Sequence, residues 1–253
     1  MTTNSTTTAP GTARTALVTG GSRGIGAATA LRLARDGADV ALTYVRDEDG
    51  ARTVVQEIRS YGRRGIALRA DSADPDAAPA AVHRAADALG RLDVLVNNAG
   101  IGVLGPIGTL TPDDADRVLA INVRAVFLAC RAAAELMGHG GRIISLGTAL
   151  SRHAGGPGST LYTMSKSALS GLTKALAREL GPRGITVNLV QPGPVDTDLN
   201  PADGPFAAGQ RSATALDRFG TPEEVASLIA YLASGEAAFI TGAELAVDGG
   251  HTA

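Results

Sequence analysis

Tyr162 and Lys166 stand four residues apart, directly after a loop interrupted by glycine and proline, in the segment HAGGPGSTLYTMSK. On a helix, this spacing places both side chains on the same face. An unperturbed tyrosine has a pKa near 10, which makes it a poor acid or base at neutral pH. A nearby ammonium stabilises the phenolate and lowers this pKa. The pair therefore predicts a phenol that can donate a proton to a carbonyl oxygen, or take it back in the reverse reaction.

A purely structural role fits the same two residues. A tyrosine can fill the core while a lysine at this spacing carries its ammonium to solvent, and the Tyr-x-x-x-Lys spacing alone favours that interpretation. Leucines continue along the predicted helix at positions 169, 172, 176 and 180, which indicates a packed helix. Its first turn is then expected at the carboxyl ends of buried parallel strands, where sheets of this kind bind ligands.

A glycine-rich turn, TGGSRGIG at residues 19–26, follows the first apolar run of the chain. Gly20, Gly24 and Gly26 allow the backbone to turn sharply and to approach a ligand closely. The N-terminus of the helix that follows offers free N–H groups and a positive dipole to a pyrophosphate. The turn has neither the Gly-Lys-Ser/Thr ending of a P-loop nor the G-x-G-x-x-G spacing. It predicts a phosphate site, with a glycine-rich turn that binds nothing as the alternative.

The end of the second apolar run distinguishes NAD from NADP. An acid there binds the ribose 2′-hydroxyl of NAD, whereas the 2′-phosphate of NADP needs a cation. Residues 40–45 contain no acid, and Tyr44 takes the usual acidic position. Arg23 and Arg46 flank the same place, and two guanidiniums that converge on a phosphate favour NADP(H) over NAD(H). Asp47 argues against this unless it begins the next helix, and both arginines could instead be solvated surface residues.

These motifs lie in a regular alternation of apolar runs and helical segments. The runs that we predict as strands span residues 15–19, 39–44, 65–70, 92–97, 142–146, 185–190 and 244–248. The segments that we predict as helices include 24–36, 47–61, 75–89, 112–137, 162–180 and 222–233. Strands that are apolar on both faces and alternate with helices form parallel βαβ units. The chain is therefore predicted to be α/β, a single-domain Rossmann-type doubly wound parallel sheet of about seven strands with helices on both faces.

Composition limits the possible functions. We expect residues 1–13 to form a flexible tail and residues 14–253 to form the single domain. The formal charge of −2 provides no footprint for nucleic acid or an anionic membrane. No apolar run approaches the roughly 20 residues that cross a bilayer, so the default location is the cytoplasm. The lone Cys130 cannot form an internal disulfide, and the histidines show no metal-ligand spacing, so no metal site is predicted.

Five motifs, in the family's order, make the sequence resemble a classical short-chain dehydrogenase/reductase of the 3-oxoacyl-acyl-carrier-protein reductase type. They are Thr19-Gly20-x-x-x-Gly24-x-Gly26, Asn97-Asn98-Ala99-Gly100, Tyr162-x-x-x-Lys166, Pro192-Gly193 and Asp248-Gly249-Gly250. The resemblance runs from about Thr15 to Gly250. It implies an NADP(H)-dependent oxidoreductase that interconverts a small-molecule ketone and a secondary alcohol, with Tyr162 as the acid and base.

The resemblance also implies catalytic roles for three further residues. Lys166 would lower the pKa of Tyr162 and bind the nicotinamide ribose. Asn122 would hold a water that leads to the lysine, a role compatible with a buried amide satisfied by backbone at a helix kink. The family's serine, which holds the substrate oxygen, is replaced by Thr148, whose hydroxyl can donate and accept in the same way.

Two serines rival Thr148 for this place. Ser145 alternates to the wrong side of its strand, and Ser151 lies further into the loop, so we favour Thr148. Its extra methyl group stiffens the side chain and narrows the pocket, which affects substrate preference more than reaction type.

The predicted cofactor contacts combine the turn residues with positions that the resemblance implies. Asp71 would meet the adenine with Ser72 beside it, Asn98 to Gly100 would lie against the ribose, and the segment from Pro192 would hold the carboxamide. In full, the predicted contacts are Gly20, Ser22, Arg23, Gly24, Ile25, Gly26, Tyr44, Arg46, Asp71, Ser72, Asn98, Ala99, Gly100, Tyr162, Lys166, Pro192, Gly193, Val195 and Thr197.

Residues 196–211 are rich in proline, glycine and aspartate and are predicted to form a lid over the substrate. The segment QPGPVDTDLNPADGP also resembles a bacterial branch of the family that includes a regulator described as binding a cyclic dinucleotide. The alternative function is therefore a nucleotide-binding sensor on the same scaffold with weak or no catalysis. The resemblance further implies a homotetramer, or a homodimer, paired through the predicted helices 112–137 and 162–180.

Overall fold

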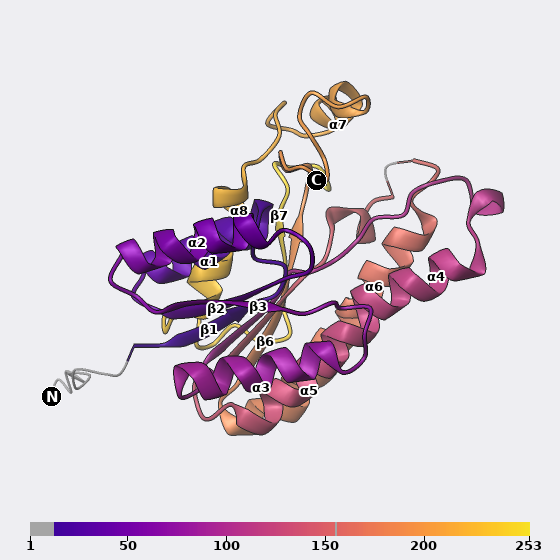
Figure 1. Ribbon diagram of the computed structural model, residues 1–253. Coiled ribbons are helices and arrows are strands. Elements are labelled where there is room, and N and C mark those ends of the chain that lie inside the picture. The colour runs from indigo at the N-terminus through magenta and orange to yellow at the C-terminus, as the bar shows by residue number, and fades with distance from the viewer. Residues whose placement is uncertain (1–12, 155) are drawn as a thin grey trace, which may run out of the picture.

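Seven parallel strands form one sheet in the computed structural model, which describes residues 13–154 and 156–253 (Figure 1). The predicted tail 1–13 lies, except for its last residue, outside the described residues. The strands are β1 (Thr15–Val18), β2 (Asp39–Tyr44), β3 (Gly65–Arg69), β4 (Val94–Asn97), β5 (Arg142–Leu146), β6 (Thr186–Pro192) and β7 (Glu244–Val247). Their order is β3-β2-β1-β4-β5-β6-β7, so the chain starts near the middle of the sheet and winds towards each edge in turn. The predicted doubly wound sheet is confirmed.

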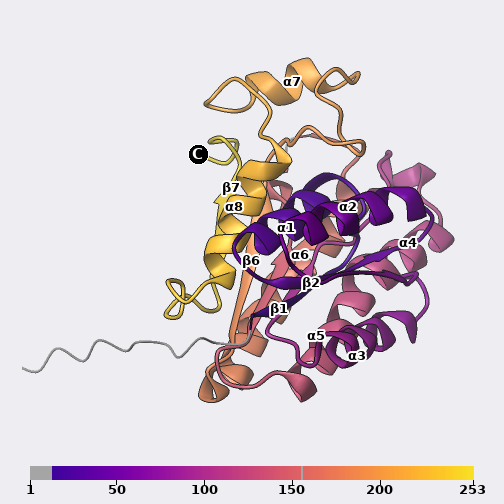
Figure 2. The same ribbon diagram turned by 60° about the vertical axis from the view of Figure 1, so that its left-hand side comes forward.

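Helices cover both faces of this sheet. They are α1 (Gly24–Arg35), α2 (Glu48–Ser60), α3 (Ala77–Leu89), α4 (Pro112–Leu119), α5 (Ala125–Leu136), α6 (Thr160–Leu180), α7 (Ala207–Ser212) and α8 (Pro222–Ala233). One apolar cluster joins the sheet to α1, α2 and α8, and a second joins its other face to α3, α5 and α6 (Figures 1 and 2). Burial on both faces explains why most strands are continuous apolar runs in the sequence.

Side-chain caps fix several helix starts. Thr111 caps α4 and Thr221 caps α8, each with proline at the next position and a reciprocal capping box. The Asp47 carboxylate accepts a hydrogen bond from the Gly50 N–H and so begins α2. Asp47 therefore begins the next helix, which is the condition under which it does not argue against NADP.

The predicted helix 112–137 is not continuous. A π-helical turn, Ala120–Arg124, separates α4 from α5. Such turns insert one extra residue and occur often at functional sites. Asn122 lies within this turn, fully buried. The helix-kink interpretation of Asn122 is consistent with this geometry.

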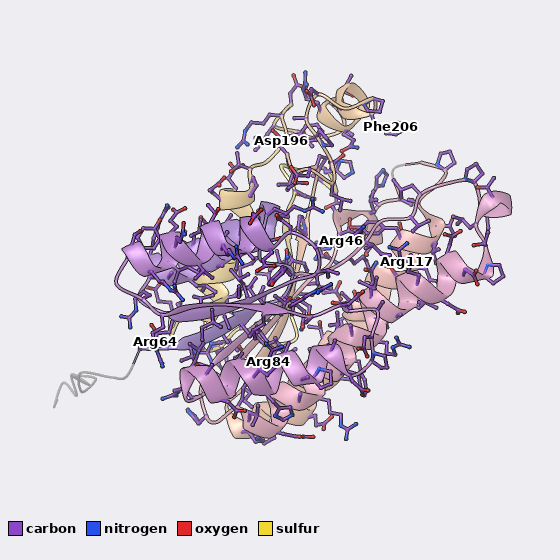
Figure 3. The ribbon with its side chains drawn as sticks, in the orientation of Figure 1. Arg46, Arg64, Arg84, Arg117, Asp196 and Phe206 are labelled. Atoms are coloured by element: carbon purple, nitrogen blue, oxygen red, sulfur yellow. The ribbon has the colours of Figure 1, made fainter. Side chains whose placement is uncertain are left out.

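Because the strands are parallel, the loops that follow them leave at one end of the sheet. The turn after β1, the loops after β4 and β5, and the segment after β6 with α7 all lie at this end (Figure 1). Figure 3 labels Arg46, Asp196 and Phe206 towards this end and Arg64 and Arg84 away from it. The candidate site is therefore confined to one end of the sheet.

Candidate dinucleotide and active site

The Tyr162 phenol lies in the first turn of α6 and meets the end of β5. Thr148, which follows β5 by two residues and is 7% exposed, has a hydroxyl that interacts with the phenol. Burial raises the pKa of Tyr162 above its ordinary value, and the interaction with Thr148 partly offsets this. The direction differs from the expectation that Lys166 lowers this pKa. In this structure the phenol is held protonated at neutral pH.

The surroundings of Lys166 explain why the pKa of Tyr162 is raised and not lowered. Its Nζ donates a hydrogen bond to the carbonyl oxygen of Leu146, at 2.8 Å, at the end of β5. The side chain is buried, and burial lowers the pKa of Lys166 to about 8. A Cβ atom at Gly100 would lie 3.1 Å from this Nζ. Because Gly100 has no side chain, the backbone just after β4 can pass directly beside the ammonium.

The π-helical turn is joined to the same place by Asn122. Its Oδ1 accepts from the Ile101 N–H at 2.9 Å, and its Nδ2 donates to the Ile101 carbonyl at 2.9 Å and to Ser165 Oγ at 3.0 Å. Ser165, fully buried, donates in turn to the Tyr162 carbonyl at 2.7 Å. The asparagine thus ties the β4 loop to the helix that carries the phenol. Its amide is already engaged on both sides by protein groups.

The two rival serines occupy other places. Ser145 Oγ accepts from Asn97 Nδ2 at 3.2 Å within the buried region beside Cys130. The Ser151 hydroxyl is buried without a hydrogen-bond partner in the described part of the chain. Of these three hydroxyls, only that of Thr148 acts on the pKa of Tyr162. The geometry thus favours the residue that the sequence favours, while its role in catalysis stays a prediction.

The glycine turn is held against the β4 loop by a compact set of bonds. Thr19 Oγ1 accepts from the Asn98 and Ala99 N–H groups, each at 3.0 Å, while Asn98 Nδ2 donates to the Thr19 and Gly20 carbonyls at 2.9 Å. A Cβ atom at Gly26 would lie 2.2 Å from the Gly20 carbonyl oxygen. Only glycine allows α1 to start this close to the turn. The arrangement leaves the helix N-terminus free for a phosphate.

The end of β2 carries the features predicted for NADP. Tyr44 ends the strand, and Arg46 beyond it is exposed and has no ion-pair partner among the described residues. Arg23, at the start of α1, is also exposed but pairs with Asp198 at 3.4 Å. Arg69 ends β3 in register with Tyr44 and is likewise exposed, a third cation that we did not predict from the sequence. Its position at a strand end, two residues before Asp71, was the available signal.

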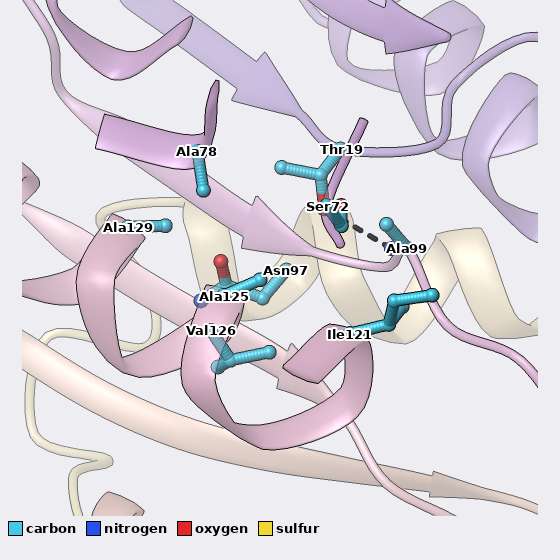
Figure 4. A pocket seen from close by; sticks show the side chains of 9 residues that line it. All are labelled: Thr19, Ser72, Ala78, Asn97, Ala99, Ile121, Ala125, Val126 and Ala129. Carbon is cyan, nitrogen blue, oxygen red and sulfur yellow. Dashed lines mark hydrogen bonds between the residues drawn. The ribbon is translucent and has the colours of Figure 1, made fainter. Parts of the chain in front are cut away.

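A small pocket lies between the ends of β1 and β4 and the π-helical turn (Figure 4). It is lined by Thr19, Ser72, Ala78, Asn97, Ala99, Ile121, Ala125, Val126 and Ala129. Ser72 and Ala99 belong to the predicted cofactor contacts. The Asp71 carboxylate beside them is exposed and accepts from the Ala73 N–H at 3.0 Å.

The segment after β6 connects the cofactor contacts with the C-terminal residues. A Cβ atom at Gly193 would lie 2.7 Å from Cα of Asp248, so glycine here permits the two segments to touch. The Asp248 carboxylate accepts from the Gly250 N–H at 3.0 Å and from Thr252 Oγ1 at 2.7 Å. Val195 forms an isolated parallel bridge with Gly220, which closes the base of the segment that includes α7. The bridge therefore fixes the start of the predicted lid and closes a longer segment, 196–219, that contains it.

The structure brings together the four predicted catalytic residues and adds Ser165 and Asp198, which we did not predict. Ser165 stands within the segment YTMSK, directly before Lys166, so its position alone could have drawn attention to it.

Among the described residues, no group of three or more His, Cys, Asp or Glu side chains could hold a metal ion. In the same part of the chain, no helix combines the length and apolarity that a membrane crossing requires.

Comparison with known proteins relates this geometry to a family. The family model described as "Enoyl-(Acyl carrier protein) reductase" matches residues 20–252. The cyclic-di-GMP-binding biofilm dispersal mediator protein of Escherichia coli is 47% identical over 94% of this chain and 97% of its own length. The 3-oxoacyl-[acyl-carrier-protein] reductase FabG of Staphylococcus aureus is 39% identical, with 94% and 97% covered. A short-chain dehydrogenase of Burkholderia cenocepacia, solved in complex with NADP, superposes with a TM-score of 0.94 at 54% identity and covers 95% and 98% of the two chains.

These matches extend over nearly the whole chain and agree with the motifs, the sheet order and the Tyr162–Lys166 helix. The expected fold and the expected enzyme class, an NAD(P)-dependent oxidoreductase, are confirmed at the level of the family. The chain belongs to the short-chain dehydrogenase/reductase family.

Proposed function

We propose that this protein is an NADP(H)-dependent reductase that interconverts a ketone and a secondary alcohol. The carrying observation is the convergence of Thr148, Tyr162 and Lys166 at the carboxyl end of β5. The phenol and the threonine hydroxyl are two hydrogen-bond donors that a single carbonyl oxygen could accept. In the described part of the chain, no cluster of metal-ligating side chains competes with them.

The residues present fit NADP(H). Gly20, Gly24 and Gly26 keep side chains away from the N-terminus of α1, where the pyrophosphate would bind. The end of β2 has no acid, and Arg46 is available for a 2′-phosphate. When bound, the cofactor would supply or accept the hydride. The Burkholderia relative solved with NADP supports this assignment.

The chain's own residues would then manage the proton. In reduction, the Tyr162 O–H would donate its proton to the substrate oxygen as negative charge develops there. Thr148 would donate a second hydrogen bond to the same oxygen and fix its position. Lys166, held by the Leu146 carbonyl, would bind the ribose and supply positive charge beside the phenol. Because the amide of Asn122 is engaged by Ile101 and Ser165, its own part would be to fix the backbone around the lysine.

The substrate is proposed to be a bulky, uncharged, largely apolar ketone. The loop after β4, residues 101–110, carries no charged side chain, and its Leu104 and Ile107 are 64% and 75% exposed. Across from it, Leu199 and Phe206 of the lid (residues 196–211) are 69% and 71% exposed. The loop begins against Tyr162, whose Cδ2 lies 3.9 Å from the Cβ position at Gly102. An apolar substrate bound between the loop and the lid would cover these side chains.

The decisive experiment measures NADPH oxidation with a panel of ketones for the wild-type protein and for Tyr162→Phe. We expect turnover of at least one apolar ketone that the variant loses while it still binds NADPH. The rival function, a nucleotide-binding regulator, has the support of the Escherichia coli relative. Tight nucleotide binding without turnover of any ketone, unchanged by Tyr162→Phe, would establish that rival and refute the proposed reaction.

We also propose self-association through the outer face of α4 and α5. Leu119, Phe127 and Leu136 are 38–50% exposed there, and a shallow groove is lined by Asp116, Leu119, Ala120, Val123, Arg124 and Phe127. Met164 of α6 adds a further half-exposed apolar side chain. Sedimentation of the wild-type protein should reveal a dimer or tetramer, and Phe127→Glu should shift it towards the monomer. A wild-type monomer at micromolar concentration would refute this.

A further inference from the structure

An exposed ion pair connects the phosphate-binding turn to the lid. Arg23 Nη1 lies 3.4 Å from Asp198 Oδ2, and the two side chains are 69% and 71% exposed. The residues are 175 positions apart in the sequence, so the contact depends entirely on the fold. Arg23 precedes α1 directly, and Asp198 is the third residue of the lid. A carboxylate therefore occupies one side of the site proposed for an anionic cofactor.

Packing beside the pair holds the base of the lid against the turn. A Cβ atom at Gly24 would lie 3.4 Å from the Thr197 methyl group, an ordinary van der Waals contact. The chain then turns back on itself, with the Asn200 N–H donating to the Thr197 carbonyl at 2.9 Å. These contacts place Asp198 beside Arg23, and the ion pair adds a further link between the lid and the turn.

The other acids and arginines nearby are arranged differently. The Asp196 carboxylate accepts from the Ala202 N–H at 2.9 Å and so serves the lid itself. Asp203 is exposed and has no ion pair with an arginine among the described residues. Arg46 is also without an acidic partner in the described part of the chain. Of the two predicted arginines, only Arg23 already has an anionic partner.

We propose that Asp198 is a specificity-determining residue that competes with the 2′-phosphate of NADP(H) for Arg23. This inference rests on the proposed function, because it takes the turn as the cofactor site. A phosphate that binds Arg23 must displace the carboxylate, and it is repelled by that carboxylate while the two are close. Binding of NADP(H) therefore releases the base of the lid, whereas NAD(H), which lacks the 2′-phosphate, leaves the ion pair in place. Asp198 lowers the preference of the enzyme for NADP(H) and makes the lid respond to the cofactor.

The test compares dissociation constants for NADPH and NADH, measured by the fluorescence of the reduced nicotinamide. Asp198→Asn should tighten NADPH binding by about two- to fivefold, the range expected of one exposed ion pair. NADH binding should be unchanged, so the NADPH/NADH preference rises by the same factor. The matched control is Asp203→Asn, which removes one negative charge from the same lid and should alter neither constant. At about 1 M salt the effect of Asp198→Asn should nearly vanish, because the Debye length falls to about 3 Å.

A double-mutant cycle identifies the partner. Arg23→Gln should weaken NADPH binding, and Asp198→Asn should have no further effect in that background. If Asp198→Asn changes NADPH and NADH equally, or acts equally with and without Arg23, the competition for the 2′-phosphate is refuted. If the wild-type protein binds neither nucleotide, the proposed function fails instead, and the two failures are distinguished.

The lid provides a second measurement. The chain contains no tryptophan, so Phe206→Trp places a single fluorophore on the exposed face of the lid. In that background, NADPH should change the anisotropy of the tryptophan, and NADH at saturation should change it less. Adding Asp198→Asn should reduce the difference between the nucleotides, because the lid base is then free in both complexes. Equal responses to both nucleotides in the Phe206→Trp protein that retains Asp198 would overturn the coupling of lid and cofactor.

Discussion

Lys166 Nζ donates a 2.8 Å hydrogen bond to the carbonyl oxygen of Leu146, the last residue of β5. The same strand end leads, two residues later, to Thr148, whose hydroxyl lowers the pKa of Tyr162. The lysine and the tyrosine therefore both interact with the short segment from Leu146 to Thr148. No acidic side chain contributes to the pKa of the buried ammonium, and burial lowers that pKa to about 8.

This burial predicts a distinctive dependence of stability on pH. Between about pH 8 and the ordinary lysine value of 10.5, the unfolded chain holds the proton on Lys166 and the folded protein does not. Because the unfolded state then binds more protons at Lys166, the contribution of this residue to the free energy of unfolding should rise with pH in this window, by up to about 3 kcal/mol. Denaturant unfolding of nucleotide-free protein from pH 7 to pH 10 measures this.

The comparison with Lys166→Met isolates the effect. The folded Cys130 thiol has a pKa of about 12 against 9.0 ordinarily, which lowers stability above pH 9 in both proteins and cancels in the difference. The variant should be more stable at pH 7 by about 1–3 kcal/mol, and this advantage should shrink as the pH rises to 10. The chain's only other lysine, Lys174, pairs with Glu244 at 2.7 Å, and Lys174→Met is the matched control. A constant difference between Lys166→Met and wild type at all pH values would contradict the assignment.

The raised pKa of Tyr162 predicts different pH profiles for the two directions of the reaction. Because burial keeps the phenol protonated at neutral pH, reduction should vary little from pH 6 to 8. Oxidation of the alcohol requires the deprotonated phenol, so its kcat/KM should rise with pH, by up to about tenfold per unit. Steady-state kinetics in both directions test this, and Tyr162→Phe should lower kcat by about 10²- to 10⁴-fold in each. An oxidation rate that is flat from pH 7 to 9 would show that the phenol is not the base.

We expect Thr148 to fix the position of the substrate oxygen and also to lower the pKa of Tyr162. The Thr148 hydroxyl lowers the pKa of Tyr162, so Thr148→Val, which keeps the shape and loses the hydroxyl, should shift the oxidation profile to higher pH. The same variant should lose about 10²-fold in kcat, the cost of one donor to a developing oxyanion. Thr148→Ser retains the hydroxyl and should restore both the profile and most of the rate. Full activity in Thr148→Val would shift attention to Ser151, whose buried hydroxyl has no partner among the described residues.

The sheet was predictable from the sequence because its strands are buried on both faces. That burial produces short apolar runs such as ALV in β1 and VLV in β4, which local patterns reveal directly. The glycines of the turn were predictable because a close backbone contact requires glycine. A Cβ atom at Gly26 would lie 2.2 Å from a carbonyl oxygen. Fold and motif positions are thus encoded locally.

The unpredicted features depend on long-range geometry. The spacing of Tyr162 and Lys166 gives their common helix face, yet it does not determine that Nζ is directed to Leu146. The π-helical turn at Asn122 adds one residue to a helix without altering its apolar composition. The pair of Arg23 and Asp198 joins two exposed, polar segments that have no periodicity. Each arises only when separate elements meet at the end of the sheet.

Ser165 should be a positioning residue for the phenol. Its hydroxyl accepts from Asn122 Nδ2 and donates to the Tyr162 carbonyl, so it links the π-helical turn to the first turn of α6. Ser165→Ala should lower kcat several-fold with little change in the KM for NADPH, and it should broaden the pH profile of oxidation, because the phenol loses its fixed position. Ser165→Cys, with a weaker donor of similar shape, should recover part of the rate. A variant that is destabilised while its kcat and pH profile are unchanged would limit Ser165 to a structural role.

We expect Asp39 to stabilise the end of the sheet that lies opposite the candidate site, where the strands begin. Its carboxylate, 5% exposed at the start of β2, binds Arg64 Nε at 2.7 Å and Arg63 Nη2 at 3.0 Å. Burial acts to raise the pKa of Asp39, but the hydrogen bonds from the two arginines outweigh it and hold the pKa below its ordinary value. A carboxylate with a depressed folded pKa contributes stability above its unfolded pKa of 3.8 and loses it as the pH falls further.

Asp39→Asn should therefore lower the free energy of unfolding by about 2–4 kcal/mol at pH 7, because it leaves the arginines beside a buried neutral amide. The deficit should narrow below about pH 4, where wild type itself loses the charge. Asp36→Asn is the matched control, since Asp36 pairs with Arg32 at 3.0 Å on the exposed surface of α1, where such a pair contributes about 0–1 kcal/mol. Urea denaturation at pH 7 and pH 3.5 separates the two, and equal losses in both variants would show that burial of the Asp39 pair adds nothing to the stability of the sheet.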